Sequence, residues 1–354
     1  MLAVAGVILA VLVVSGSALS LMRSKVWWVR VWDFPRLQLA VVGIVALALL
    51  GASSPWRSPV LLALGALAAA AVCFQVALVW RYTRLAPREV QRSALDDPAR
   101  RLSLVVSNVL QTNREADHLL AVVREADPDV VLCVEADGWW RERLDALIAS
   151  YPHTVQLPMD NTYGMLLYSR LPLERTSVDF LVEPDVPSMQ AVVRLRGGQG
   201  VWLNCVHPRP PAPGESDESL ERDAELLIVG RRVRDSALPV VVCGDLNDVA
   251  WSRTTRLFQK TSGLVDPRKG RGFFSTFHAR WPGLRYPLDH VFHSTDFRLV
   301  AMRRLPYVGS DHFPMQAILS HEPQAGAEQS APEADADDAR EAAETVADAR
   351  GTSS

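Results

Sequence analysis

Three long apolar stretches occupy the first quarter of the chain, at residues 1–22, 37–54 and 59–80. Each has about the 17–25 residues with which a helix crosses a bilayer. The first could be a signal peptide, but it lacks a basic segment and two more apolar stretches follow it, which favours a true membrane helix. The pattern therefore predicts three transmembrane helices within residues 1–85.

From residue 102 onward the pattern changes to short apolar runs that alternate with amphipathic segments. Strands are predicted at residues 102–109, 130–134, 165–168, 191–195, 201–206, 240–243, 290–293 and 315–319, and helices at 115–125, 139–149, 219–234 and 252–259. The run Val240-Val241-Val242-Cys243 is apolar at every position, which indicates a strand covered on both faces. We therefore expect an α/β fold over residues 102–320, in which two packed sheets lie between outer helices as a four-layer sandwich.

Two polar segments flank this region. Residues 86–101 carry many charges and two prolines and are predicted to form a basic linker. Residues 321–354 are rich in Ala, Glu, Asp and Ser and contain no aromatic residue, so they cannot bury enough apolar surface to order themselves. We expect a disordered acidic tail, in which only residues 337–349 could form a weak helix.

Charge is distributed unevenly, although the formal net charge of the whole chain is only −3. Residues 1–101 carry 11 basic and 4 acidic side chains, whereas residues 321–354 carry 2 basic and 9 acidic ones. The region between them has no basic excess, so strong non-specific binding to duplex DNA is not predicted.

The basic residues near the apolar stretches also predict an orientation. The segments after the first and third stretches are rich in Lys and Arg, whereas the loop after the second holds only Arg57. Because Lys and Arg favour the cytoplasmic side, we expect a multi-pass cell-membrane protein with its N-terminus outside and residues 102–320 in the cytoplasm. Tryptophans at the ends of the spans are expected to lie at the bilayer interface, namely Trp27, Trp28, Trp32, Trp56 and Trp80.

Polar residues stand where several of the predicted strands end. Asp245 and Asn247 follow an apolar run and are two residues apart, so in an extended chain their side chains point the same way. The carboxylate could hold or deprotonate a water and the amide could hold a phosphate oxygen, although Gly-Asp-Leu-Asn is also good turn chemistry. Glu135 and Asn108 also follow apolar runs, and their oxygens suit Mg²⁺.

Two histidines stand in similar places. His207 ends one apolar run, and His312 follows Asp311. An imidazole can take or give a proton near neutral pH. Asp289 could accept a hydrogen bond from one imidazole and fix its tautomer, while Asp311 could bind a metal. Each residue alone has an ordinary structural explanation, but together they favour a metal-dependent enzyme that acts on a phosphate ester.

Seven short motifs that contain these residues resemble the endonuclease/exonuclease/phosphatase superfamily, and they occur in its order. They are Ser107-Asn108-Val109, Val134-Glu135, the run from Tyr163 to Arg170, Val206-His207-Pro208, Gly244-Asp245-Leu246-Asn247, Leu288-Asp289-His290-Val291 and Ser310-Asp311-His312-Phe313-Pro314. The chain looks most similar to a bacterial branch with hydrophobic N-terminal spans, the YafD-like proteins. The resemblance implies a DNase I-like two-sheet fold and hydrolysis that depends on Mg²⁺ or Mn²⁺.

The resemblance also implies how the metal and the water are held. Glu135 would be the principal metal ligand, and Asn108 and Asp311 would help around the metal and the phosphate. Asp245 would align or activate the attacking water, and Asn247 would hold the phosphate.

For the histidines, the resemblance implies contacts with the reacting phosphate. His312, oriented by Asp289, would stabilise the pentacovalent phosphate or transfer a proton. His207 would contact the phosphate or protonate the leaving oxygen.

Three functions remain open at this point. The first is a membrane-anchored nuclease or general phosphodiesterase, and the second is a phosphatase or phosphodiesterase that acts on a lipid head group or a small soluble phosphate ester. The third is a non-enzymatic membrane scaffold, which the complete set of predicted site residues disfavours. The bilayer and a phosphate-ester substrate, either nucleic acid or lipid head group, are the partners that the sequence indicates. Arg268, Lys269 and Arg271 form a local basic loop that could contact phosphate or simply be solvated.

Overall fold

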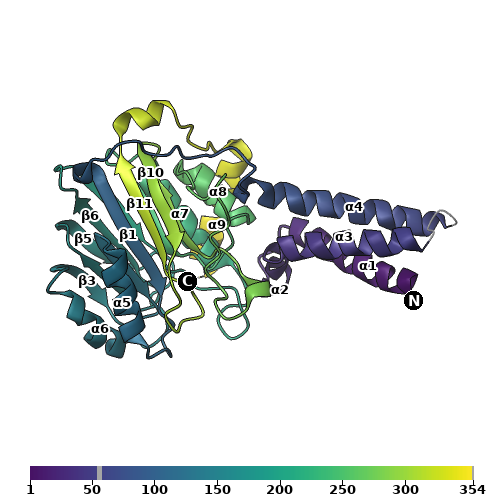
Figure 1. Ribbon diagram of the computed structural model, residues 1–354, viewed down its shortest axis with the longest axis horizontal. Coiled ribbons are helices and arrows are strands. Elements are labelled where there is room, and N and C mark those ends of the chain that lie inside the picture. The colour runs from purple at the N-terminus through teal and green to yellow at the C-terminus, as the bar shows by residue number, and fades with distance from the viewer. Residues whose placement is uncertain (54–57, 353–354) are drawn as a thin grey trace. The chain divides into compact units, whose positions relative to one another are not determined.

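The structure is a computed structural model that describes residues 1–53 and 58–352. Its contacts divide the chain into two compact units, and Figure 1 labels many of their helices and strands. The helical unit comprises Met1–Pro87 together with Pro211–Ser219, and the sandwich unit comprises Arg88–Pro210 together with Leu220–Ser354.

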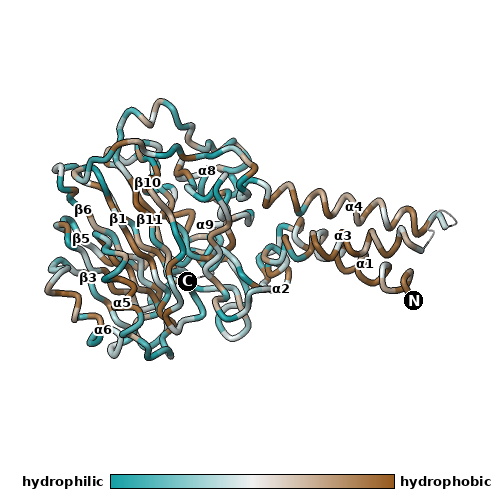
Figure 2. The backbone as a smooth tube through the Cα atoms, viewed as in Figure 1, coloured by the Kyte–Doolittle hydropathy of each residue, from teal (hydrophilic) through white to brown (hydrophobic). Residues whose placement is uncertain are grey.

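Three long apolar helices pack on one another in the helical unit. They are α1 (Leu2–Leu21), α3 (Arg36–Ala52) and α4 (Pro59–Val79), and they are joined by the shorter α2 (Trp27–Arg30), η1 (Val31–Asp33) and η3 (Trp80–Tyr82). Figure 2 shows hydrophobic residues along nearly the whole length of the three long helices, and α1 and α4 contain no charged residue. A helix that is apolar on every side suits a lipid environment better than a surface position on a soluble domain.

Two helices are long and apolar enough to cross a membrane, namely Leu2–Leu21 and Pro59–Tyr82. The segment between them meets the same test only as a pair, Trp27–Asp33 with Arg36–Ala52, which is bent by 73°. The expectation of three transmembrane helices is therefore supported for two, and a third depends on whether the bent pair forms one span. The predicted end of the second span at Ser54, together with Trp56 and Arg57, lies outside the described residues.

A small polar cluster lies buried between these apolar helices. Arg36 Nη1 donates to Gln75 Oε1 at 3.0 Å, and Gln75 Nε2 donates to Ser17 Oγ at 2.8 Å. Arg36 also forms an ion pair with Asp33. Because each helix contributes one of these side chains, the hydrogen bonds link α1, α3 and α4.

The sandwich unit contains two mixed β-sheets. The six-stranded sheet has the order β10-β11-β1-β2-β4-β3, and the five-stranded sheet has the order β5-β6-β7-β8-β9. The strands are β1 (Arg101–Asn108), β2 (Val130–Val134), β3 (His153–Leu157), β4 (Met165–Ser169), β5 (Leu173–Asp179), β6 (Ser188–Arg194), β7 (Gly200–Cys205), β8 (Val240–Asp245), β9 (Asp289–His293), β10 (Phe297–Arg304) and β11 (Met315–His321). Only β1–β2 and β7–β8 are parallel pairs, so the carboxyl ends of these strands lie at the same edge of each sheet.

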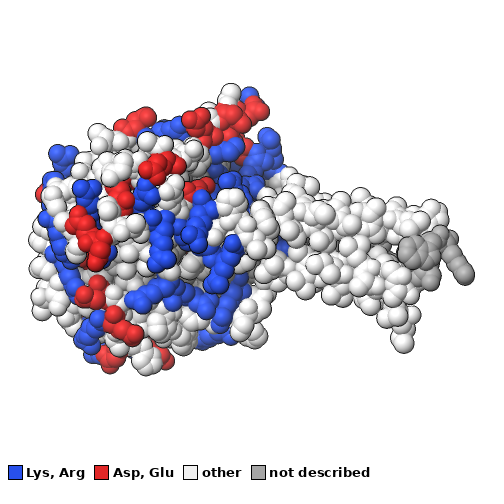
Figure 3. All heavy atoms as spheres, turned by 45° about the horizontal axis from the view of Figure 1, so that its top comes forward, with Lys and Arg blue, Asp and Glu red and all other residues white. Residues whose placement is uncertain are grey.

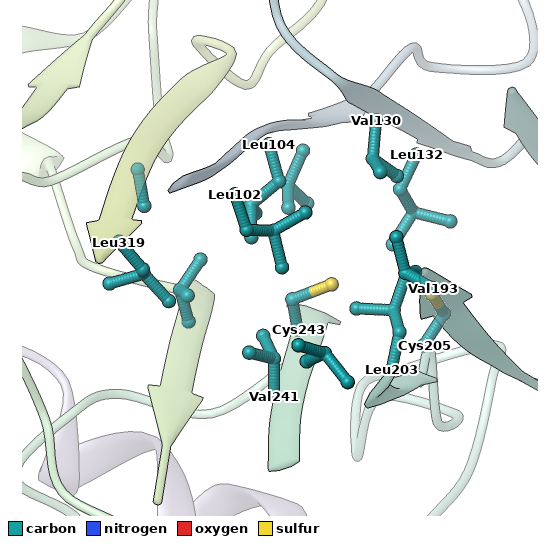
Figure 4. Packing of buried hydrophobic residues seen from close by; sticks show 14 of the residues in the cluster. Leu102, Leu104, Val130, Leu132, Val193, Leu203, Cys205, Val241, Cys243 and Leu319 are labelled. Carbon is teal, nitrogen blue, oxygen red and sulfur yellow. The ribbon is translucent and has the colours of Figure 1, made fainter. Parts of the chain in front are cut away.

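Helices cover the outer face of each sheet, and the inner faces pack together, which confirms the predicted four-layer sandwich. The helices are α5 (Ala116–Ala126) and α6 (Gly138–Leu144) on the six-stranded sheet, and α7 (Leu220–Arg234) and α8 (Arg253–Ser262) on the five-stranded one. Figure 4 shows Leu102 and Leu104 of one sheet pointing toward Val241 and Cys243 of the other. Val242 points outward toward α7, which explains why the run in β8 is apolar at every position.

The prediction of a disordered tail at residues 321–354 is wrong, because most of this segment is ordered in the sandwich unit. Helix α9 (Ala336–Thr352) packs against α7 and α8 through Ala342, Val346 and Ala349, which lie on one face at helical spacing. Two ion pairs add to this contact, Lys260 with Asp338 and Arg253 with Glu341. Two of the acidic residues in this segment, Asp338 and Glu341, therefore neutralise basic residues of α8.

The expected basic linker is also partly ordered. Val90 is fully buried in the core between the two sheets, and Arg92 pairs with Leu299 of β10. Glu89 forms an ion pair with Lys269 at 2.7 Å. Residues 88–101 of the predicted linker thus belong to the sandwich unit.

Candidate active site

All eight polar residues predicted from the sequence meet at one edge of the sandwich. Asn108 ends β1, Glu135 follows β2, His207 follows β7, Asp245 ends β8, Asn247 lies two residues later, Asp289 begins β9, and Asp311 and His312 precede β11. The strand register explains why they meet, because Asp245 lies directly opposite Asp289 in the β8–β9 ladder and Asn108 pairs with Val134 in the β1–β2 ladder.

Close backbone packing shapes the loops that carry two of these residues. Glu135 and Asn247 both adopt positive φ angles, 59° and 51°, which are costly for residues other than glycine. A Cβ atom at Gly164 would clash with the carbonyl oxygen of Ala136, next to Glu135. A Cβ atom at Gly244, where φ is 146°, would clash with the carbonyl oxygen of Val206. Only glycine therefore allows the backbone approach that fixes the carboxylates beside these positions.

The buried Asn108 side chain joins two of the carboxylates. Its Nδ2 group donates to Glu135 Oε1 at 2.6 Å and to Asp245 Oδ2 at 3.0 Å. Its Oδ1 accepts from the backbone N–H of Leu110 at 3.0 Å. In this arrangement Asn108 turns a donor toward the site and orients the carboxylates, and its predicted contact with a metal stays a prediction.

His312 lies between two buried aspartates. Its Nδ1 is 2.8 Å from Asp289 Oδ2, and its Nε2 is 3.5 Å from Asp245 Oδ2. Burial opposes a positive charge on the ring, but the Asp245 and Asp289 carboxylates outweigh burial and raise the pKa of His312 to about 10. His312 is therefore an imidazolium at neutral pH, and it donates to Asp289.

The two aspartates respond to this imidazolium differently. Burial would raise the pKa of Asp245, but the charges of His312 and His207 and two hydrogen bonds outweigh it, so the pKa is lowered. For Asp289 burial is the stronger influence, and its pKa is raised despite the hydrogen bond from His312. Asp245 is thus a stable carboxylate that accepts hydrogen bonds.

The negative charge of Glu135 is only partly offset by the groups around it. Its side chain is 19% exposed, and burial of the remainder raises its pKa to about 7. The hydrogen bond from Asn108 and the charge of His312 lower the pKa, whereas the nearby charges of Asp245 and Asp311 raise it again. Crowded carboxylates whose charges oppose each other favour a bound cation.

The described residues offer two places for a metal ion. Asp245, Asp289 and His312 present ligand atoms within 4.8 Å of one another. A metal at this place would have to displace a proton from His312, however, and Asp289 already accepts a hydrogen bond from its Nδ1. Glu135 with the neighbouring Asp311 has oxygen donors and excess negative charge, so this pair fits a hard divalent cation better.

The opposite side of the site is formed around His207, which is 2% exposed. Its Nε2 lies 4.0 Å from Glu135 Oε1, and its ring lies 5.6 Å from the ring of Tyr163. Asn247 Nδ2 donates to the carbonyl oxygen of Pro208 at 3.0 Å, which leaves its amide oxygen as the acceptor toward other groups. This side therefore carries a buried imidazole beside Glu135 and an amide that is held by the backbone carbonyl group of Pro208.

Two further buried residues, Ser310 and Arg268, support the site through contacts that the sequence did not indicate. Ser310 Oγ donates to the carbonyl oxygen of Asn108 at 2.8 Å and accepts from the backbone N–H of His312 at 3.0 Å. Arg268 is fully buried, forms an ion pair with Asp266, and contacts His290 Nδ1 at 2.6 Å. The interpretation of this basic loop as solvated or phosphate-binding is therefore wrong for Arg268, whose charge is already neutralised. A sequence cannot show this pairing, because it depends on the fold of the loop.

Comparison with known proteins agrees with this architecture. Residues 105–312 match the Endonuclease/Exonuclease/phosphatase family. No curated protein sequence matches the chain significantly.

Several solved structures share the fold. Among these, D. rerio TDP2 in complex with a single-strand DNA product is 17% identical, with a TM-score of 0.52 over 62% of this chain and 99% of that chain. An endonuclease/exonuclease/phosphatase from Beutenbergia cavernae is 23% identical, with a TM-score of 0.51 over 63% and 72% of the two chains. The human Nocturnin catalytic domain with a bound sulfate is 15% identical, with a TM-score of 0.50 over 66% and 99%. At these identities the similarity confirms the two-sheet fold of the sandwich unit.

Proposed function

Because the chain belongs to the Endonuclease/Exonuclease/phosphatase family, whose members hydrolyse phosphate esters, we propose that it is a divalent-metal-dependent phosphodiesterase of the nuclease type. The observation that carries this proposal is the unbroken series of contacts from Glu135 through Asn108, Asp245 and His312 to Asp289. The series joins a carboxylate group that can hold a cation to an imidazolium that can neutralise a phosphoryl oxygen.

Glu135 and Asp311 are the residues that would hold Mg²⁺ or Mn²⁺. Both offer carboxylate oxygens, and Asn108 fixes the orientation of Glu135 through its 2.6 Å hydrogen bond. When bound, the ion would neutralise charge on the phosphoryl oxygens and lower the pKa of a coordinated water.

Asp245 is suited to position the attacking water. Its pKa is lowered, so it stays ionised and accepts hydrogen bonds across the working pH range. The backbone N–H of Asn247 donates to its Oδ1 at 2.9 Å and Asn108 donates to its Oδ2, which together fix the plane of the carboxylate. A carboxylate held in this way orients a water more effectively than it removes a proton, because its basicity is low.

His312 acts on the phosphate as a charged donor in this proposal. Its raised pKa keeps the ring protonated, and Asp289 holds Nδ1, so Nε2–H faces Asp245. A fixed positive charge there stabilises the negative charge that develops on the pentacovalent phosphate. His207 and the amide of Asn247 would contact the phosphate from the other side.

We further propose that the apolar helices α1 and α4 anchor the enzyme in the cell membrane. Their length and composition support this assignment. Anchoring raises the local concentration of substrates near the bilayer, so a phosphodiester in a lipid head group is the second candidate substrate. A phosphatase acting on small soluble esters would gain nothing from that location.

Hydrolysis by the purified full chain in detergent tests the proposal. The substrates are bis(p-nitrophenyl) phosphate, single-stranded and duplex DNA, RNA, phospholipids and inositol phosphates, each with Mg²⁺, Mn²⁺ or a chelator. We expect metal-dependent cleavage of a phosphodiester that Asp245→Asn abolishes. The matched control is Glu225→Gln, because Glu225 is a buried acid on α7 whose hydrogen bond comes from Ser188 outside the site. Turnover that survives in Asp245→Asn, or that is indifferent to the chelator, would contradict the proposed mechanism.

A further inference from the structure

Most arginines around the site are neutralised by nearby acids. Arg114 pairs with Asp137, and Arg209 pairs with Glu183 and Asp185. Arg222 and Arg268 likewise pair with aspartates, as Arg222 with Asp223 and Arg268 with Asp266. Arginines with a carboxylate partner have little positive potential left for a substrate.

Three arginines near the loop that carries His312 differ from these. Arg280 donates to the carbonyl oxygen of Gly309 at 2.8 Å and to the hydroxyl of Tyr307 at 2.9 Å. Arg285 donates to the carbonyl oxygen of Ala279, and Arg304 donates to that of Ser275, each at 3.0 Å. Neutral acceptors of this kind orient a guanidinium without cancelling its charge. Within the part of the chain that the structure describes, none of the three arginines forms an ion pair with a carboxylate. We call these three residues the arginine rim.

The aromatic ring of Phe313 brings two of these charges next to the catalytic loop. Arg304 Cζ lies 4.4 Å from the centre of the Phe313 ring, and Arg285 Cζ lies 5.1 Å from it. Phe313 directly follows His312, so both guanidinium groups pack on the residue next to the proposed phosphate-binding imidazolium in the chain. Stacking on the Phe313 ring restricts the rotamers of both arginine side chains before a ligand binds, so their charges are preorganised.

Two like charges on one ring oppose each other unless an anion compensates them. Burial lowers the pKa of Arg304, and the neighbouring charge of Arg285 lowers it further. A phosphate has a negative charge and several acceptor oxygens, and it would compensate both guanidinium groups at once.

We propose that the arginine rim is a subsite for a second phosphate, namely the one next to the scissile phosphodiester in a single nucleic-acid strand. The inference rests on the proposed function and assigns it a substrate class. Single strands are favoured because Tyr307 and Trp281 are 42% and 62% exposed beside these arginines, and aromatic faces next to basic groups suit unpaired bases. The lack of a general basic excess agrees, since only a few phosphates need to be contacted.

A chemical substitution in the substrate isolates this contact. The probe is a short fluorescein-labelled oligothymidylate in which the phosphate next to the scissile one is replaced by an uncharged methylphosphonate. The full chain should bind the unmodified strand about tenfold more tightly than the methylphosphonate strand, because one charge-assisted contact is lost. Arg304→Gln and Arg285→Gln should weaken binding of the unmodified strand by a similar factor and should no longer distinguish the two strands. Each variant should also reduce the slope of log affinity against log salt by about 0.7.

Binding is measured by fluorescence anisotropy in the Asp245→Asn background, so the result does not depend on turnover. Arg253→Gln is the matched control, because Arg253 is partly exposed and pairs with Glu341 of α9, outside the rim. In the parent chain, kcat/KM for bis(p-nitrophenyl) phosphate should stay within about twofold for the rim variants, because that ester has only one phosphate.

The outcomes separate the alternatives. Equal losses on both substrates would overturn the subsite and assign the rim to positioning of His312. A dependence on the rim that is seen with vesicles containing a phosphorylated inositol lipid, but not with the oligothymidylate, would overturn the nucleic-acid assignment. Rim-dependent strand binding without metal-dependent cleavage of any ester would support the subsite and refute the proposed hydrolysis.

Discussion

Replacing Glu135 by Gln tests where a divalent cation binds, because the change removes one negative charge and preserves the size of the side chain. Burial raises the pKa of Glu135 to about 7, so below that pH a cation must displace a proton from it. For a single proton with this pKa, the Kd for Mn²⁺ should fall about tenfold between about pH 6 and pH 8 and then level off. In Glu135→Gln the Kd should be larger by at least about 100-fold at pH 8 and should lose this pH dependence.

Calorimetric titration of the full chain with Mn²⁺ measures both quantities, and two buffers of different ionisation enthalpy count the protons released. Glu225→Gln is the control, because burial raises the pKa of Glu225 to about 8 without any contact to the proposed metal ligands. It should leave the Mn²⁺ affinity and its pH dependence unchanged. A wild-type Kd that is equal at pH 6 and pH 8, or a Glu135→Gln protein with the same dependence as wild type, would refute the assignment.

Three further predictions follow from the same structure. Asp289→Asn removes the charge that holds His312 Nδ1, so kcat should fall by about 10²–10⁴-fold with little change in KM, and an unchanged kcat in steady-state assays would show that this hydrogen bond is dispensable. Glu225 keeps its proton up to about pH 8 in the folded protein but releases it near pH 4.5 in the unfolded chain. The free energy of unfolding of the wild-type protein should therefore decline by up to a few kcal/mol between about pH 5 and pH 8. Thermal unfolding of Glu225→Gln should lack this part of the decline. Three membrane crossings would place tags at the two termini on opposite faces, with the C-terminal tag in the cytoplasm, whereas protease accessibility of both tags from one face would establish an even number of crossings.

The strands that the sequence predicted are those buried on both faces. β2 and the first four residues of β8, Val240 to Cys243, are apolar at every position, and both strands were predicted to within two residues of their ends. The three strands that were missed, β3, β5 and β10, are sheet edges. Their residues are largely half-buried or exposed, so they lack the continuous apolar runs by which a central strand is recognised. Sequence periodicity therefore predicted the core of each sheet but not its full width.

The tail was mispredicted for a related reason. The composition of residues 321–354 is polar on average, but Ala342, Val346 and Ala349 concentrate its few apolar groups on one face. Small alanines on a helix bury modest area individually, and their contribution depends on a complementary surface that only the folded α7 and α8 provide. Such a segment becomes ordered only where a folded surface is available for it to pack on, and the composition of the segment does not reveal that surface.

The site residues could be predicted individually because each stands at the end of an apolar run, but their chemistry could not. The sequence drew attention to Arg268 as a possible phosphate contact, whereas Asp266 neutralises it completely inside the protein. Arg285 and Arg304 carry no local signal, because they meet only where Phe313 brings their segments together. The charge available to a substrate is thus a property of tertiary pairing and not of local composition.

The geometry of the site depends on the packing of the two sheets against each other. Asn108 belongs to the six-stranded sheet and Asp245 to the five-stranded one, so their 3.0 Å hydrogen bond crosses the sandwich. The 2.8 Å contact between His312, which precedes β11, and Asp289 of β9 crosses it as well. Neither contact can form within one sheet alone, so the imidazolium acquires its raised pKa only when the apolar inner faces are packed. The same burial that holds the sheets together therefore creates the charged donor that the proposed reaction needs, and catalysis should be lost as soon as the sheets separate, even if each retains its strands.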